Sequence, residues 1–349
     1  MSSTTLPARR VGWLVGVSLA SIGTAAFPQA TLAQTAKPID DARLLAAGGD
    51  ADNWLTFGHD YTNQRFSALK QVDRTNVGKL APAWIYQLGT TASTQMQPLV
   101  ADGVMYFPAP NDDIVAVKAD TGEEIWRYRH KFTTPRAAPG SRGIALGYGM
   151  VFEGTDDKRV IAVDQATGKL LWDHEVKGFD PATVPGLVQH GAKVGPVNFS
   201  FRYPAEVYDG MVIVSTTLNS GPIGNIADFI KNEKDGADIG TDYLQANLGV
   251  RGFTVALDAK TGNEVWRFYT SPDRDWEGSY GTVAANGTKL VDRDVAAEKA
   301  MAVFYTAGWA ANGTAVAWAP AIDPALGLLY LPTGNPGIPF DLLRPGDNL

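Results

Sequence analysis

Few residues of this chain could do chemistry on the strength of their type and spacing alone. Arg142 lies between Ser141 and Gly143, and a guanidinium there could stabilise negative charge that develops on a bound molecule. Asn335 lies within Thr333–Pro336, and a side-chain amide oxygen can ligate a hard cation such as Ca²⁺. Taken alone, the first pattern is typical of a surface loop and the second of a turn. Their chemistry therefore depends on the elements that position them.

The composition excludes several kinds of site. The chain contains no cysteine, which rules out disulfides, thiolate metal sites, a cysteine nucleophile and covalent c-type haem. The formal net charge is −7 and no basic cluster stands out, so we expect no nucleic-acid partner. No pair of carboxylates can be placed as a glycosidase-type propeller would require. Single charges and amide oxygens on a scaffold remain.

The scaffold is indicated by a repeat of the form Ala-x-Asp-x-x-Thr-Gly-x-x-x-Trp. It occurs at 256–266 and 162–172, and at 116–126 with Lys118 in the Asp position. An Asp at the start of the reversal can accept N–H groups of the turn, and a Gly at its end can adopt a positive φ. Each copy therefore predicts two strands joined by a short turn, with the Trp buried between adjacent units.

A second repeat, a hairpin of short apolar strands, accompanies the first. Its copies lie at 98–107, 144–152, 205–214 and, more loosely, 321–331, and they turn at Asp102-Gly103, Tyr148-Gly149, Asp209-Gly210 and 324–327. The first two complete units repeat every 46 residues, from Trp126 to Trp172. Two hairpins per unit and this period are typical of a propeller blade. We predict an all-β fold, a β-propeller of four-stranded antiparallel blades.

The first 33 residues are typical of an export signal. Arg9-Arg10 gives a positive start, 11–26 is apolar but short for a membrane span, and Thr31-Leu32-Ala33 offers a small-residue cleavage site. A retained anchor helix is the alternative. We therefore predict a signal peptide at 1–33 and a flexible lead-in at 34–53. The mature protein would be periplasmic, with no stable membrane span.

Several motifs in order carry a family resemblance. The opening from Trp54 to Leu69, the Thr-Gly-x-x-x-Trp copies, Gly249–Gly252 and Thr333–Pro336 together resemble the pyrroloquinoline quinone (PQQ)-dependent, or quinoprotein, alcohol dehydrogenases. The resemblance covers nearly all of 54–349. It implies an eight-bladed propeller, of which about half is present, with an insertion at about 219–249.

The resemblance also implies a function. It is the periplasmic oxidation of an alcohol, or of a sugar or polyol, to the carbonyl by hydride transfer to PQQ, assisted by calcium. Electrons would pass to a separate acceptor such as a cytochrome c or a quinone. Half a ring does not enclose an axial site, so we expect the chain alone to be inactive.

Carried over residue by residue, the family pattern assigns Arg142 to the quinone oxygens and Asn335 to the calcium ion. The family's cofactor-binding glutamate is Gln95 here. Its carboxylate calcium ligand is Asn247 or Asn219, depending on where the insertion lies. Each change replaces a charged acceptor with a neutral amide, so we expect weaker calcium binding.

Four further residues are weighed near the cofactor. Trp318 corresponds, one residue out of register, to the tryptophan that stacks on PQQ, and inter-blade packing is its alternative. Thr216 or Thr217, at the end of the third hairpin, would reach the cofactor rim. The family's catalytic aspartate falls beyond Leu349. Glu277 lies in a segment that resembles the catalytic one but precedes Asn335, so it is only the alternative base.

The rival interpretation is a non-enzymatic binding propeller of the outer-membrane assembly scaffold type, which shares this blade repeat. That scaffold is usually anchored through an N-terminal cysteine, which is absent here. The matches at Arg142 and Thr333–Pro336 favour the enzyme. The insertion could be a lid, a partner surface or a decorative loop, and the sequence leaves these possibilities open.

Overall fold

The computed structural model describes residues 37–90, 92, 94–133, 140–180, 183, 199–218, 251–271, 273, 280–289, 294–297, 314–316 and 318–336. The chain divides into residues 1–36 and 37–349, and the elements below belong to the second unit. The predicted signal peptide lies outside the described residues. Among the residues described, no helix combines the length and apolarity needed to cross a bilayer.

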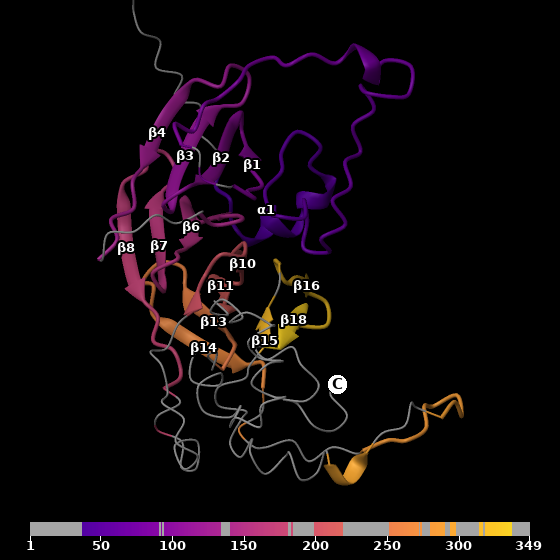
Figure 1. The fold of residues 1–349 in the computed structure, drawn as a ribbon. Coiled ribbons are helices and arrows are strands. Elements are labelled where there is room, and N and C mark those ends of the chain that lie inside the picture. The colour runs from indigo at the N-terminus through magenta and orange to yellow at the C-terminus, as the bar shows by residue number, and fades with distance from the viewer. Residues whose placement is uncertain are drawn as a thin grey trace, which may run out of the picture. The chain divides into compact units, whose positions relative to one another are not determined.

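Three four-stranded antiparallel sheets confirm the predicted blade repeat (Figure 1). Blade 1 consists of β1 (Leu99–Ala101), β2 (Val104–Ala109), β3 (Asp113–Lys118) and β4 (Glu124–Tyr128). Blade 2 consists of β5 (Ala145–Gly147), β6 (Met150–Gly154), β7 (Arg159–Asp164) and β8 (Leu170–Glu175). Blade 3 consists of β10 (Glu206–Tyr208), β11 (Met211–Ser215), β13 (Phe253–Asp258) and β14 (Glu264–Tyr269).

The remaining strands form two-stranded sheets. Strand β9 (Phe199–Ser200) pairs with β12 (Thr217–Leu218), β15 (Thr314–Val316) with β18 (Thr333–Pro336), and β16 (Ala321–Asp323) with β17 (Leu328–Tyr330). The β16–β17 pair is the looser hairpin copy. Thr333–Pro336 is a strand, although its residue types alone suggest a turn. Its backbone pairs with β15, so tertiary pairing overrides the local preference.

The turns behave as their residue types predict. In blade 2, the Asp164 Oδ1 accepts hydrogen bonds from the Thr167 backbone N at 2.8 Å and from its hydroxyl at 2.7 Å. Gly168 then adopts a φ of 69°, which costs a glycine little. Asp258 makes the same bonds in blade 3. In blade 1, where Lys118 replaces the aspartate, its Nζ instead pairs with Glu123 at 2.6 Å.

Each tryptophan of the first two blades joins its blade to the next one. The Trp126 Nε1 donates to the Gln165 carbonyl at 3.1 Å, and the indole covers Gly168, where an added Cβ would lie 2.5 Å from a ring carbon. The Trp172 Nε1 donates in the same way to the Ala259 carbonyl at 2.9 Å. We call this pairing of an indole with the neighbouring Thr-Gly turn the indole–glycine contact. It confirms the predicted place of these tryptophans between units.

A third indole–glycine contact comes from a residue outside the recognised repeat copies. The Trp84 Nε1 donates to the Ala119 carbonyl at 3.1 Å. Its ring covers Gly122, where an added Cβ would lie 2.6 Å from ring carbons. Blade 1 is therefore covered by Trp84 in the way that blade 2 is covered by Trp126.

Residues 37–53 differ from the predicted flexible lead-in, because they fold onto the blades. The short helix α1 (Asp41–Leu45) is capped by Asp40, whose side chain accepts from the Arg43 backbone N. Ile39 and Leu44 are fully buried in the main hydrophobic core. The Arg43 guanidinium binds both carboxylate oxygens of Asp102, at 2.7 and 2.9 Å. A short apolar anchor and one bidentate pair are enough to order a polar segment.

Candidate functional site

Arg142 is positioned by its own main chain. It directly precedes β5, at the end of blade 2 that also carries the β6–β7 turn. Its backbone N donates to the Arg202 carbonyl at 2.7 Å, and its carbonyl accepts from the Gln97 backbone N at 3.1 Å. Gly143 follows because a Cβ there would lie 2.8 Å from the Pro204 ring. The guanidinium is thus presented from a backbone that is held on two sides.

The Arg142 guanidinium contacts two aromatic rings. Its Cζ lies 4.9 Å from the centroid of the Tyr203 ring and 5.2 Å from that of Trp318. The two rings are 6.0 Å apart and inclined at 50°. Cation–π attraction at these distances favours the arrangement. We call these three residues the arginine–aromatic cluster.

Trp318 does not pack in the core, which was its alternative interpretation. Its side chain is 49% exposed, and its φ of 73° is uncommon for a bulky residue. The opening segment of the propeller holds the chain just beyond it. The Asn63 Nδ2 donates to the Pro320 carbonyl at 2.8 Å, and the Ile322 backbone N donates to the Tyr61 carbonyl at 2.9 Å. The backbone on one side of the indole is therefore fixed from a distant part of the sequence.

The two threonines of the third hairpin have different surroundings. Thr216 is fully buried, and its hydroxyl is engaged by the Phe253 backbone, donating to the carbonyl at 3.1 Å and accepting from the N–H at 2.9 Å. Thr217 is half-buried, and its Oγ1 accepts from the Arg202 backbone N at 3.1 Å. The Arg202 carbonyl in turn accepts from the Arg142 backbone N, so Thr217 lies one backbone link from the arginine–aromatic cluster.

The other predicted residues are placed only in part. Gln95 is exposed and lies two positions before Gln97, whose backbone N binds the Arg142 carbonyl. The backbone of Asn335 belongs to β18, and its side chain lies outside the described residues, as do Asn219, Asn247 and Glu277. No group of three His, Asp or Glu side chains suited to a metal occurs among the residues described. Tyr203 was missed by sequence reasoning because no motif marks it.

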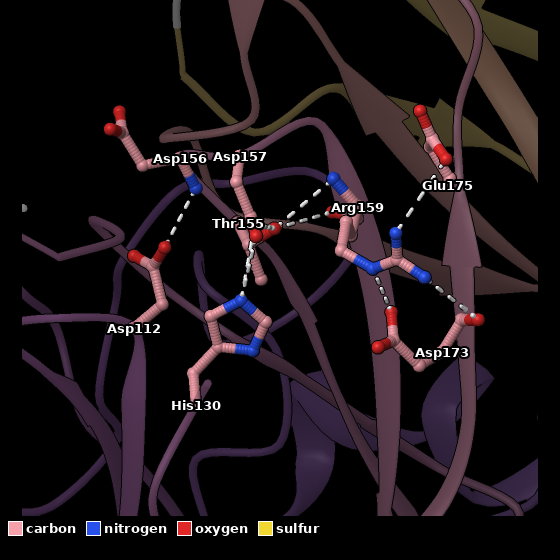
Figure 2. Close-up of polar contacts among 8 residues, drawn as sticks. All are labelled: Asp112, His130, Thr155, Asp156, Asp157, Arg159, Asp173 and Glu175. Atoms are coloured by element: carbon pink, nitrogen blue, oxygen red, sulfur yellow. Dashed lines mark hydrogen bonds and ion pairs between the residues drawn. The ribbon is translucent and has the colours of Figure 1, made fainter. Parts of the chain in front are cut away.

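A second polar cluster, also missed, lies at the same end of blades 1 and 2 (Figure 2). Asp112, in the β2–β3 turn, accepts from the Asp156 backbone N at 2.7 Å. The His130 Nε2 lies 3.1 Å from the Asp157 Oδ1, which also accepts from the Thr155 hydroxyl at 2.6 Å. On the next strand Arg159 is paired with Asp173 at 2.5 Å and with Glu175 at 3.8 Å, the residues that complete the group in Figure 2.

Burial dominates the electrostatics of this buried acidic cluster, by which we mean Asp112, Glu153, His130 and Asp157. Burial raises the pKa of Asp112 to about 7. Burial also raises the pKa of Glu153 well above its ordinary value, and Asp112 and Asp113 raise it further. Burial lowers the pKa of His130, but the hydrogen bond and charge of Asp157 outweigh it and leave that pKa raised. The cluster therefore holds protons that exposed carboxyl groups would release.

The comparisons with known proteins now bear on the family. Residues 54–226 match the family model described as "Glucose/ethanol/alcohol dehydrogenase, beta-propeller domain". Quinohemoprotein alcohol dehydrogenase ADH IIB of Pseudomonas putida is 32% identical over 91% of this chain and 39% of its own length. The quinohemoprotein alcohol dehydrogenase of Comamonas testosteroni is 30% identical over 97% of this chain and 42% of its own.

Solved structures agree with the sequence relatives. The crystal structure of the Comamonas testosteroni enzyme superposes with a TM-score of 0.57 at 26% identity, covering 88% of this chain and 41% of that one. The structure of ADHIIG from Pseudomonas putida gives a TM-score of 0.57 at 26% identity, covering 86% and 37%. The chain thus spans about two fifths of the length of the relatives it matches. With its blades, its indole–glycine contacts and these matches, the chain belongs to the PQQ-dependent alcohol dehydrogenase family of β-propellers.

Proposed function

We propose that this chain carries the PQQ-binding region of a periplasmic dehydrogenase that oxidises an alcohol, or a sugar or polyol, to the carbonyl. The observation that supports the proposal best is the arginine–aromatic cluster. PQQ is a planar, conjugated and anionic molecule. A guanidinium with a planar fork of donors suits its oxygens, and the half-exposed face of Trp318 suits stacking. The residues present therefore fit this cofactor.

Each residue of the cluster has a distinct part in the proposal. Bound PQQ supplies the acceptor for the hydride that leaves the alcohol carbon. Arg142 holds a permanent positive charge beside the quinone oxygens and stabilises negative charge there. Tyr203 keeps the guanidinium in place through its ring. Trp318 limits the access of water to one face of the site.

Calcium would be ligated by amide oxygens. In this proposal Asn335 is one ligand and Asn247 or Asn219 another, and the ion polarises the oxygens around it. Neutral amides compensate less of the ion's charge than a carboxylate does, so calcium should bind more weakly than at a site that contains glutamate. The electrons would pass to a separate cytochrome c or quinone, because the chain has no cysteine to attach haem.

The binding step can be tested on the chain itself. PQQ is titrated into the purified protein with and without calcium, and quenching of tryptophan fluorescence is measured. Loss of a hydrogen bond to a charged group costs about 1.5–3 kcal/mol, so Arg142→Gln should weaken binding by about tenfold or more. Arg74→Gln, at an exposed arginine away from the cluster, is the matched control. Equal affinities for the two variants would contradict the assignment of Arg142.

The calcium ligands are tested in the same titration. Asn335→Ala should weaken binding of calcium together with PQQ, and unchanged affinity would remove Asn335 from the site. Asn247→Glu and Asn219→Glu restore a carboxylate at the two alternative positions. Only the variant at the true ligand position should tighten calcium binding, because the added charge acts over contact distance.

We also propose that this chain alone does not turn over alcohol. A positioned general base contributes about 100- to 10,000-fold, and the resemblance places that base beyond Leu349. The assay is dye-linked alcohol oxidation by the purified chain with PQQ and calcium. Turnover that disappears in Glu277→Gln would assign the base to Glu277 instead.

Export is a separate proposal. It rests on the sequence pattern of residues 1–33. N-terminal sequencing of protein from the periplasmic fraction should begin near Gln34. An intact Met1 on membrane-bound protein would contradict it.

A further inference from the structure

Residues 82–88, which we call the edge segment, have the alternating burial of a β-strand. Trp84, Tyr86 and Leu88 are half-buried, and the residues between them are exposed. Ile85 is 83% exposed. A period of two is what a strand with one covered face shows. The edge segment therefore presents one face to the protein and leaves the other open.

The covered face is fixed to blade 1 as a fourth strand is fixed to the next blade. Trp84 makes the indole–glycine contact with the Thr-Gly turn of blade 1. The Tyr86 ring meets that of Phe107 edge-on at 5.5 Å, and its hydroxyl accepts from the Arg127 Nη2 at 2.8 Å. In blades 1 and 2 the tryptophan that makes this contact belongs to the last strand, β4 or β8. By position and contact, the edge segment is a last strand too.

What a last strand pairs with is constant in the three blades. Its tryptophan lies opposite an alanine of the third strand, and the pairs are Ala116 with Trp126, Ala162 with Trp172, and Ala256 with Trp266. The edge segment has the tryptophan, but no described strand takes the place of that third strand. Within the described part of the chain, no backbone hydrogen bond joins residues 82–88 to any other residue. A row of free N–H and C=O groups is a template for strand addition.

The third strand must come from a distant part of a polypeptide. In the three blades, a short turn links the third strand to the fourth. The edge segment is instead preceded by Leu80-Ala81 and begins at Pro82, which has no N–H to continue a ladder. A second copy of the described blades cannot supply the strand, because β3, β7 and β13 are each paired on both sides.

We propose that the edge segment is the last strand of a further blade and binds a β-segment by antiparallel strand addition. The occupant is a polypeptide whose third strand presents a small residue opposite Trp84 and then turns. It corresponds to part of the length that the relatives have and this chain does not match. Backbone hydrogen bonds supply affinity, and the indole selects the register because a large residue opposite it would not fit.

The test uses the absence of cysteine from the chain. Ile85→Cys creates a single thiol on the open face of the strand. The probe is a separate polypeptide with the sequence of residues 145–168, which covers β5 to β7 and the following turn. In blade 2, Ile161 lies opposite the residue that follows Trp172, so a probe with Ile161→Cys should form a disulfide with the thiol introduced at position 85. A probe with Val160→Cys, whose thiol points to the other face, is the register control.

The proposal expects at least a severalfold higher disulfide yield for the probe with Ile161→Cys than for the one with Val160→Cys. It also expects a loss of that yield when Ala162 of the probe is replaced by Phe. Equal yields at the two positions, or no disulfide at any probe concentration, would overturn it. A homodimer linked through the introduced thiols in preference to the probe would overturn the stated occupant and assign this face to a second copy. Neither PQQ nor calcium enters the test, so its outcome is independent of the proposed function.

Discussion

Asp112→Asn should remove a pH dependence of stability that the wild-type protein owes to one buried carboxyl group. Asp112 is 1% exposed and has a φ of 56°, which asparagine adopts as readily as aspartate. The Asn carbonyl oxygen can still accept from the Asp156 backbone N. The substitution therefore removes the ionisation and little else.

The magnitude follows from the pKa. Burial raises it from 3.8 to about 7, with Asp156 and Asp157 adding to the rise and the Asp156 N–H and His130 opposing it. Each pKa unit corresponds to about 1.4 kcal/mol. Below pH 3.8 the carboxyl group is protonated in both states. As the pH rises above that value the unfolded chain ionises and the folded one does not, so the free energy of unfolding falls by up to about 4 kcal/mol before the pH reaches about 7.

The assay is urea unfolding of the wild type and Asp112→Asn at intervals between about pH 4.5 and 8. The difference between about pH 4.5 and 6 is the most informative, because His130 starts to titrate only above that window. The variant should gain on the wild type by about 1.4 kcal/mol per pH unit there. Asp258→Asn is the control of opposite sign, since hydrogen bonds from Thr261 lower the pKa of Asp258. Parallel profiles for Asp112→Asn and the wild type would refute the reasoning.

Three further outcomes are expected. Glu206→Gln should likewise flatten the pH profile, because burial raises the pKa of Glu206 to about 8; urea unfolding of the double variant with Asp112→Asn should show additive gains. Gly168→Ala should destabilise by at least about 1–2 kcal/mol, since its φ is positive and the Cβ would meet the Trp126 ring; a thermal midpoint equal to that of the wild type would contradict this. Asn63→Asp places a carboxylate against the Pro320 carbonyl and should cost about 1–3 kcal/mol in urea unfolding, with Asp60→Asn as the control for charge.

The fold could be predicted from the sequence because its signal is repeated. One Asp-x-x-Thr-Gly turn is weak, but three copies at the same place in a two-hairpin unit specify strand order, register and the place of each tryptophan. Trp84 escaped this reasoning because its strand lacks the preceding turn. What identifies it is the contact with Gly122, which only the three-dimensional structure shows.

The site was less predictable for a physical reason. Arg142 and Trp318 were selected through the family pattern, and the structure brings them together. Tyr203 was not selected, because its place beside Arg142 follows from a backbone bond between two residues far apart in sequence, Arg142 and Arg202. The buried acidic cluster was missed for the same reason. Its members come from separate turns and strands, and no local spacing relates Asp112 to Glu153.

The indole–glycine contact also explains how this chain tolerates a long insertion. Trp172 reaches the Ala259 carbonyl across 87 positions of sequence, yet the contact matches the one made by Trp126 across 39. The insertion joins β11 to β13 at the end of the blade opposite the Thr-Gly turn, where neither the indole nor its glycine is touched. One end of each blade is thus held constant by packing while the other is free to lengthen. Arg142 lies at the end that can lengthen, so new loops can change what approaches the site while the junctions between blades stay the same.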